Sequence, residues 1–102
     1  MWRQGDVLIR AIMEIPPAAL RQKSMVLASG DTTGHVHRIE KNRKARVFSL
    51  PGGDDGELLL EVIADQARVV HPEHETITLH RGRYRVWRQR EFDGDRDRNV
   101  RD

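Results

Sequence analysis

The sequence predicts an all-β domain, a small barrel or sandwich of seven to eight short antiparallel strands. Two observations predict this fold. Short apolar stretches of strand length follow one another about every ten residues, a spacing typical of barrels and sandwiches. Clusters of Gly, Pro, Ser and Asp stand between these stretches and supply the turns. The chain of 102 residues is long enough for one domain with one modest core.

The first strand is expected at 5–12. Val7 and Ile9 fall on one face of this strand, and Leu8 and Ile12 fall on the other. Both faces are therefore largely apolar, which places the strand near the centre of the sheet.

Further strands are expected, in order, at 25–28, 32–40, 45–50, 57–63, 67–71, 76–79 and 83–92. Pro16-Pro17 ends the first strand, because proline cannot donate to a strand ladder. Residues 18–23 are expected to form one short helical turn. Residues 51–56, with three Gly and one Pro, are the clearest turn and should join two antiparallel strands. Arg81-Gly82 marks a second tight turn, before the last strand.

The composition limits the cellular location of the protein and the extent of its folded domain. The absence of cysteine excludes disulfides, thiolate metal sites and cysteine nucleophiles. The start of the chain has no apolar signal-peptide core, and no apolar run is long enough for a membrane helix, so a cytoplasmic protein without a membrane partner is expected. Residues 93–102 hold one apolar residue in ten and are expected to stay disordered. The β domain is therefore placed at 1–92.

All five histidines fall in two short segments. His35 and His37 are separated by one residue, so in a strand both project from the same face. In the second segment Pro72 restrains the backbone beside His71, which presents His71 and His74 from a rigid corner. If the two segments meet in space, they supply three or four imidazole nitrogens. The predicted metal ligands are therefore His35, His37, His71 and His74.

Three carboxylates could complete or replace a ligand: Glu40, Glu73 and Glu75. Imidazoles with carboxylates suit zinc, iron, nickel or manganese. An open coordination position would permit hydrolysis or oxygen chemistry, whereas four protein ligands would indicate a structural site, so the sequence leaves enzymatic activity undecided. The alternative is that the histidines pair with acids on a solvated face. Asp6 is a further candidate ligand or base, although an Asp after a Gly at a strand start more often binds turn amides.

The sequence around these residues resembles two protein families. His35 and His37, followed by Glu40, are similar to the first motif of the cupins, although the spacing to Glu40 is short and the second cupin motif is absent. The closer resemblance is carried by Gln4-Gly5-Asp6-Val7-Leu8, Thr33-Gly34-His35-Val36-His37-Arg38-Ile39, His71-Pro72-Glu73-His74 and the strand that begins at Gly82. These segments resemble a family of small uncharacterised bacterial and phage proteins that share Q-G-D-V-L, T-G-H-x-H-R and H-x-E-H. The resemblance implies that the two histidine segments belong together, and it implies no activity.

A second hypothesis is a non-enzymatic assembly or binding module, of a kind associated with phages or mobile elements. A small β domain has strand edges to cover, so a homo-oligomer is expected. Nucleic acid is an unlikely partner, because 18 basic residues are dispersed among 16 acidic ones and the longest basic stretch is Lys41-Asn42-Arg43-Lys44. Nucleic-acid binding through this loop and the strand with Arg85 and Trp87 is kept as a third hypothesis.

Overall fold

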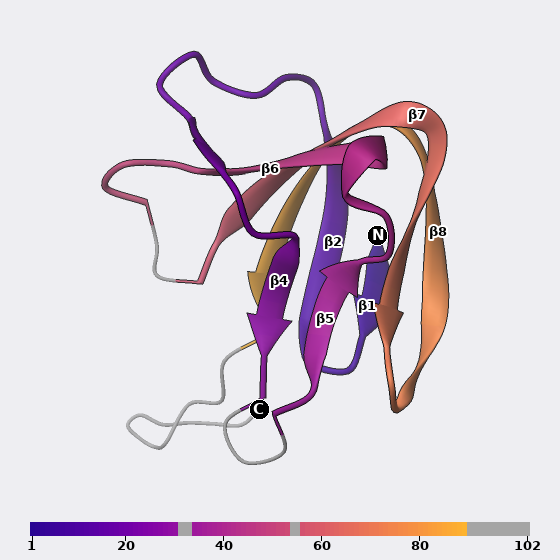
Figure 1. Ribbon diagram of the computed structural model, residues 1–102. Coiled ribbons are helices and arrows are strands. Elements are labelled where there is room, and N and C mark those ends of the chain that lie inside the picture. Colours follow the sequence, from indigo (N-terminus) through magenta and orange to yellow (C-terminus); the bar gives the residue numbers. More distant parts are fainter. Residues whose placement is uncertain (31–33, 54–55, 90–102) are drawn as a thin grey trace, which may run out of the picture.

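A curled antiparallel sheet of eight strands forms the protein in the computed structural model, which describes residues 1–30, 34–53 and 56–89 (Figure 1). The strands are β1 (Trp2–Gln4), β2 (Val7–Ile12), β3 (Leu20–Gln22), β4 (Val26–Ser29), β5 (Val36–Ile39), β6 (Ala45–Ser49), β7 (Leu58–His71) and β8 (His74–Arg88). One turn of 3-10 helix, η1 (Asn42–Lys44), joins β5 to β6. The predicted all-β class and the strand number are therefore confirmed.

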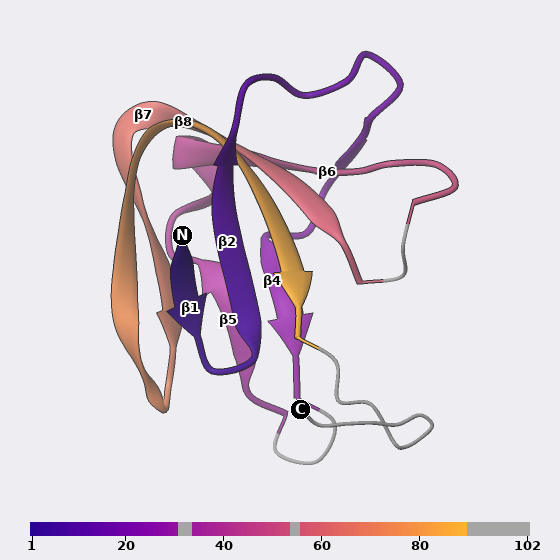
Figure 2. The same ribbon diagram turned by 180° about the vertical axis from the view of Figure 1, so that it is seen from behind.

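The two last strands run through the whole sheet and curl it into a half-barrel (Figures 1 and 2). β7 has 14 residues and β8 has 15. The first half of β7 pairs with β6 and its second half pairs with β5, so the sheet divides along one side of β7. β8 pairs with β7 along its length and, on its other side, with β2. The edges are β1 on β2, β3 on β6, and β4 on β5.

A bulge bends the β7–β8 hairpin in its middle. Val62 pairs with Gly82, and the next pair is Gln66 with His80. β7 therefore has three residues between these pairs and β8 has one, and such extra residues bend and twist a strand. The sequence predicted a break in each strand here, with a reversing turn at Arg81-Gly82, and this prediction is wrong. Gly82 is paired within β8, so the local turn signal produces a bend in a continuous strand and no reversal.

Two further expectations at the start of the chain need correction. Residues 18–23 form no helical turn, because Leu20–Gln22 is β3, which pairs antiparallel with β6. The strand expected at 5–12 begins at Val7, and the sequence reading missed β1, which pairs with it. Only one face of β2 is buried, because Val7 and Ile9 are inaccessible to solvent while Arg10 is exposed.

The other expected strands lie close to their predicted positions. The antiparallel pair of β6 and β7 on either side of 51–56 confirms that turn. The stretch expected at 32–40 is a strand only at Val36–Ile39, with residues 31–33 outside the described part of the chain. β8 ends at Arg88, and the tail expected at 93–102 also lies outside the described residues.

The core fills the concave side of the half-barrel. Its fully buried side chains come from β2, β5, β6, β7 and β8; the largest are Ile9, Ile39, Leu60, Leu79, Val7, Val47, Val62, Val69 and Val86. Trp2 packs against the edge of Tyr84, with ring centroids 5.6 Å apart. The Tyr84 hydroxyl donates a hydrogen bond to the carbonyl of His80 at 2.7 Å. Two polar side chains, Gln4 and His37, are buried together with these apolar ones.

Candidate functional site

Two strand turns and the start of β5 meet at one end of the half-barrel (Figures 1 and 2). Gly5 and Asp6 form the turn between β1 and β2, and Pro72 and Glu73 form the turn between β7 and β8. Gly5 has φ +61°, in the left-handed region that glycine adopts without strain. We call this end the histidine rim, because His35, His37, His71 and His74 all lie on it.

The β7–β8 turn presents two of these histidines side by side. His71 and His74 are paired residues of the ladder, separated by the two-residue turn. The backbone N–H of Glu73 donates to Nδ1 of His71 at 3.0 Å, which orients that ring. The rigid corner expected from Pro72 is therefore the tip of the long hairpin.

The two histidine segments meet at the rim. The ring of His71 is the centre of the group, with its centroid 4.2 Å from that of His37 and 4.6 Å from that of His74. His35 and His71 are 5.9 Å apart, and His37 and His74 are 5.8 Å apart with nearly parallel rings. The meeting follows from the pairing of β5 with the second half of β7, in which Arg38 lies opposite Val70.

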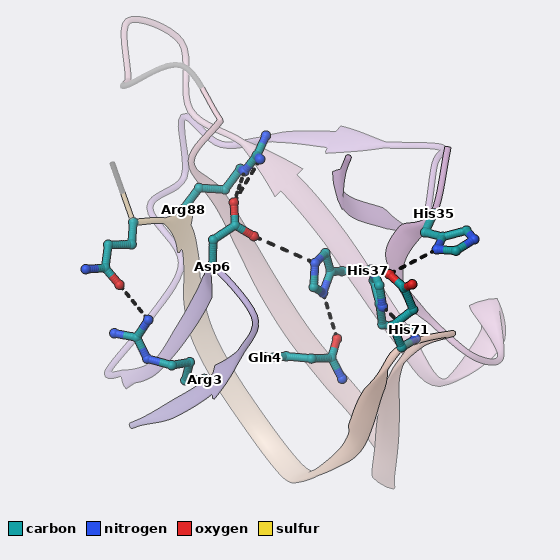
Figure 3. Close-up of polar contacts among 9 residues, drawn as sticks. Arg3, Gln4, Asp6, His35, His37, His71 and Arg88 are labelled. Atoms are coloured by element: carbon teal, nitrogen blue, oxygen red, sulfur yellow. Dashed lines mark hydrogen bonds and ion pairs between the residues drawn. The ribbon is translucent and has the colours of Figure 1, made fainter. Parts of the chain in front are cut away.

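A buried amide holds His37 from one side (Figure 3). Gln4 is 2 % exposed, and its Nε2 donates to the carbonyls of Val69 at 3.0 Å and Glu75 at 2.8 Å. Its Oε1 lies 2.9 Å from Nδ1 of His37. Because the amide nitrogen already donates to two carbonyls, Oε1 must be the acceptor and His37 Nδ1 the donor. The neutral ring of His37 therefore keeps a lone pair on Nε2.

A carboxylate faces that lone pair. Oδ1 of Asp6 lies 3.8 Å from Nε2 of His37, while Oδ2 of Asp6 accepts from Nη2 of Arg88 at 2.8 Å and from Nε of Arg88 at 3.0 Å (Figure 3). The carboxylate is thus fixed from behind and presents its other oxygen to the imidazole. When His37 is neutral, two acceptors face each other across this gap, and a cation or a proton donor between them would satisfy both.

Electrostatics keep His37 neutral and Asp6 charged. Burial, followed by the neighbouring His71, lowers the pKa of His37 from 6.5 to about 4. Partial burial would raise the pKa of Asp6, but the hydrogen bond and charge of Arg88 outweigh it and hold that pKa below 3.8. Burial and the neighbouring His74 lower the pKa of His71 as well. Neutral imidazoles beside a carboxylate are the forms in which these groups bind metals.

The remaining predicted residues lie at different distances from this centre. Glu73 is at the rim, with Oε1 3.3 Å from Nδ1 of His35. Glu75 contributes its carbonyl to Gln4, and its side chain is exposed. Glu40 follows the far end of β5 and pairs with Arg68 at 3.4 Å. The fifth histidine, His80, lies opposite Gln66 and away from the other four.

The rim is not arranged as a closed metal centre. Within residues 1–30, 34–53 and 56–89, no three His, Asp or Glu side chains surround a common point as the ligands of a bound ion do. His37 and Asp6 are held by Gln4 and Arg88, whereas His74 is exposed and Nδ1 of His71 is bound to the backbone. Closure around an ion would therefore come from rotation of the hairpin-tip histidines toward the fixed pair.

The sequence reading missed Gln4 and Arg88, and it set Asp6 aside as a turn residue. Gln4 and Asp6 flank Gly5 in the Q-G-D segment, on which the family resemblance partly rests. That segment was the sequence signal that could have identified them as site residues. Arg88 comes from the far end of the chain and reaches Asp6 because Val7 pairs with Arg88.

Fold and rim together define a small β half-barrel with a polar, histidine-lined end. The family model described as Domain of unknown function (DUF8820) matches residues 3–89, and the chain belongs to this family. No curated protein and no solved structure matches the chain. Among the described residues, no helix is long and apolar enough to cross a membrane.

Proposed function

We propose that the protein binds a divalent transition metal ion at the histidine rim. His37 and Asp6 are the fixed ligand pair, His71 and His74 join them from the hairpin tip, and His35 is the fourth imidazole of the set. The donor set of imidazoles and one carboxylate suits zinc, iron, nickel or manganese.

The gap between His37 and Asp6 is the observation that carries the proposal. Zinc binds imidazole nitrogen at about 2.0–2.1 Å and carboxylate oxygen at about 2.0–2.2 Å, so two ligand atoms of one tetrahedral ion lie about 3.3–3.5 Å apart. The observed separation of 3.8 Å is slightly wider, so a small approach of the two side chains would bring both atoms to ligand distance. Gln4 and Arg88 hold the outer sides of the pair in the way that partners of metal ligands commonly do.

Metal binding can be measured on tag-free protein by plasma mass spectrometry and by calorimetric titration with zinc, manganese, nickel and ferrous iron. We expect about one ion per chain for the preferred metal. Asp6→Asn and His74→Ala should each weaken binding at least about tenfold, because the first removes the negative charge of a ligand and the second removes an imidazole. Gly5→Ala should weaken binding indirectly through His74, because the added Cβ would lie 2.8 Å from Nε2 of that ring.

His80→Ala is the matched control, because it removes an exposed histidine outside the rim. Circular dichroism establishes that each variant is folded. The proposal fails if none of the four metals binds to folded wild-type protein. It also fails if His80→Ala weakens binding as much as His74→Ala, since that result would indicate unspecific binding to surface imidazoles.

We further infer self-association through the strand edges. β3 pairs only with β6, and β4 pairs only with β5, so each offers unpaired backbone groups on its other side within the described chain. Leu20 on β3 is 57 % exposed and Val26 on β4 is 38 % exposed. Apolar side chains on open edges favour pairing with a second copy.

Light scattering on size-separated protein at micromolar concentration should give a discrete oligomer. Leu20→Lys should shift it toward the monomer, because a charge on an edge strand opposes pairing. Arg10→Lys, on the exposed face of β2, is the control and should leave the oligomer unchanged. A wild-type protein that is monomeric at this concentration contradicts the inference.

A further inference from the structure

The fold gathers basic residues that are dispersed in the sequence. A groove of about 680 Å³ lies between the segment that leads into β4 and the η1 turn, and it adjoins a second one of about 510 Å³. Both grooves are lined by Lys23 and Arg43, with Arg38 and Lys41 along the first and Arg21 along the second. We call these five residues the basic groove. It lies toward the end of β5 that is opposite to His35, away from the histidine rim.

Among the described residues, the cations of this groove have no carboxylate partner, unlike the arginines of β6, β7 and β8. Arginines of β6, β7 and β8 form ion pairs with carboxylates: Arg46 and Arg83 with Glu61, Arg68 with Glu40, Arg81 with Asp65, Arg85 with Glu57, and Arg88 with Asp6. Within the described residues, no cation of the basic groove forms an ion pair with a carboxylate. Arg38 donates only to the backbone carbonyls of Ile39 and Glu40.

The groove has one acidic lining residue, Glu40, and its carboxylate is already paired with Arg68. Five cations from three chain segments therefore line a concave surface on which no described carboxylate pairs with them. Such a surface attracts a polyanion, and the attraction is strongest for regularly spaced phosphates.

We propose that the basic groove binds the phosphate backbone of a nucleic-acid duplex. The lining residues include no aromatic side chain on which unpaired bases could stack, whereas proteins that bind single strands use such platforms. Besides the cations and Glu40, the grooves are lined by the apolar Met25, Val26 and Ile39 and by two amides, Gln22 and Asn42. The cations therefore contact mainly the phosphate backbone, which carries no base sequence.

Salt dependence gives the proposal a quantitative test. Each phosphate contact contributes a slope of about −0.9 to the logarithm of the binding constant against the logarithm of salt concentration. Five contacts give a slope of about −4.5, which is a loss of roughly 500-fold in affinity between about 50 and 200 mM salt. Lys41→Gln/Arg43→Gln removes two exposed cations and should reduce the slope to about −2.7.

The experiment is fluorescence anisotropy with a labelled DNA duplex, the full chain and a chelator in the buffer, so that the result does not depend on metal binding. The control is Arg10→Gln/Arg81→Gln, which changes the net charge equally at exposed positions outside the groove. This control should keep the wild-type slope.

Three results would overturn the proposal. The first is an equal salt slope for the groove and control variants. The second is tighter binding of a labelled single strand than of the duplex. The third is binding to vesicles of anionic lipid without binding to the duplex. The second would indicate base stacking at another surface, and the third would assign the groove to a membrane headgroup. Weaker duplex binding with a reduced slope in the groove variant, and not in the control, supports the proposal.

Discussion

Replacing Gln4 with leucine should lower the free energy of unfolding by about 3 kcal/mol, because a buried polar group left without its partner costs about 1–3 kcal/mol. The Gln4 amide connects three parts of the fold, namely the carbonyl of Val69, the carbonyl of Glu75 and the ring of His37. Leucine has a similar volume and satisfies none of these groups. Urea unfolding of the metal-free protein measures the difference.

Gln22→Leu is the matched control for this variant. Gln22 is also a strand glutamine, but it is only half-buried and hydrogen bonds to Leu20 and Ser49 near the sheet edge. Its replacement should cost less than about 1 kcal/mol, because water can reach the groups that it leaves. If Gln4→Leu costs no more than Gln22→Leu, the buried amide does not hold the rim together.

The same variant should weaken metal binding by about 10–100-fold, because the partner that fixes the tautomer of His37 is lost. His37→Gln separates the two effects. In a His37→Gln background, which itself removes a proposed ligand, Gln4→Leu should retain the part of its cost in stability that comes from the carbonyls of Val69 and Glu75, as urea unfolding can measure.

Acid should destabilise the metal-free protein over a defined range of pH. In the unfolded chain His37 has its ordinary pKa of 6.5, whereas burial lowers its pKa to about 4 in the folded protein. Above pH 6.5 neither state is protonated there, so His37 contributes no pH dependence. As the pH falls from 6.5 to 4, the unfolded state gains a proton that the folded state does not, and stability falls by up to about 3 kcal/mol.

Urea titrations at several pH values between about 7 and 4 in the presence of a chelator measure this loss. The lowered pKa of His71 acts in the same direction. The lowered pKa of Asp6 becomes important only below its ordinary value of 3.8, as acid protonates it. His37→Gln should remove most of the slope and His80→Gln should not. A wild-type slope that persists in His37→Gln would assign the effect to other groups.

Local sequence was sufficient to bring His71 beside His74, because Pro72 with Glu73 makes a tight turn. The shared strand face predicted for His35 and His37 is a different case, since β5 begins at Val36 and His35 precedes it. Whether the two segments meet depends on β5 pairing with the second half of β7. No local pattern encodes this pairing, because short strands of similar apolar content could pair in many orders.

The parts that sequence reasoning missed are those that only long-range pairing defines. Asp6 follows a Gly at the start of a strand, where a role in the turn is the ordinary interpretation. Its actual partner is Arg88, which comes from the end of β8. Gln4 likewise has polar neighbours only because β1 lies beside the tip of the long hairpin. The turn wrongly predicted at Arg81-Gly82 shows the same limit, since a bulge and a reversal have similar local signals.

The pairing of β2 with β8 also bears on the order of events as the chain leaves the ribosome. Val7 and Ile9 emerge early, yet the strand that covers their ladder on one side ends only at Arg88. The β7–β8 hairpin closes through a two-residue turn and can form quickly, whereas β2 must close a loop that spans almost the whole described chain. Within the described residues, β2 therefore waits for the strand that is synthesised after all the others. Gln4 and Asp6 can reach His37 and Arg88 only when that docking is complete, so an assembled rim marks a sheet in which β8 is already in place.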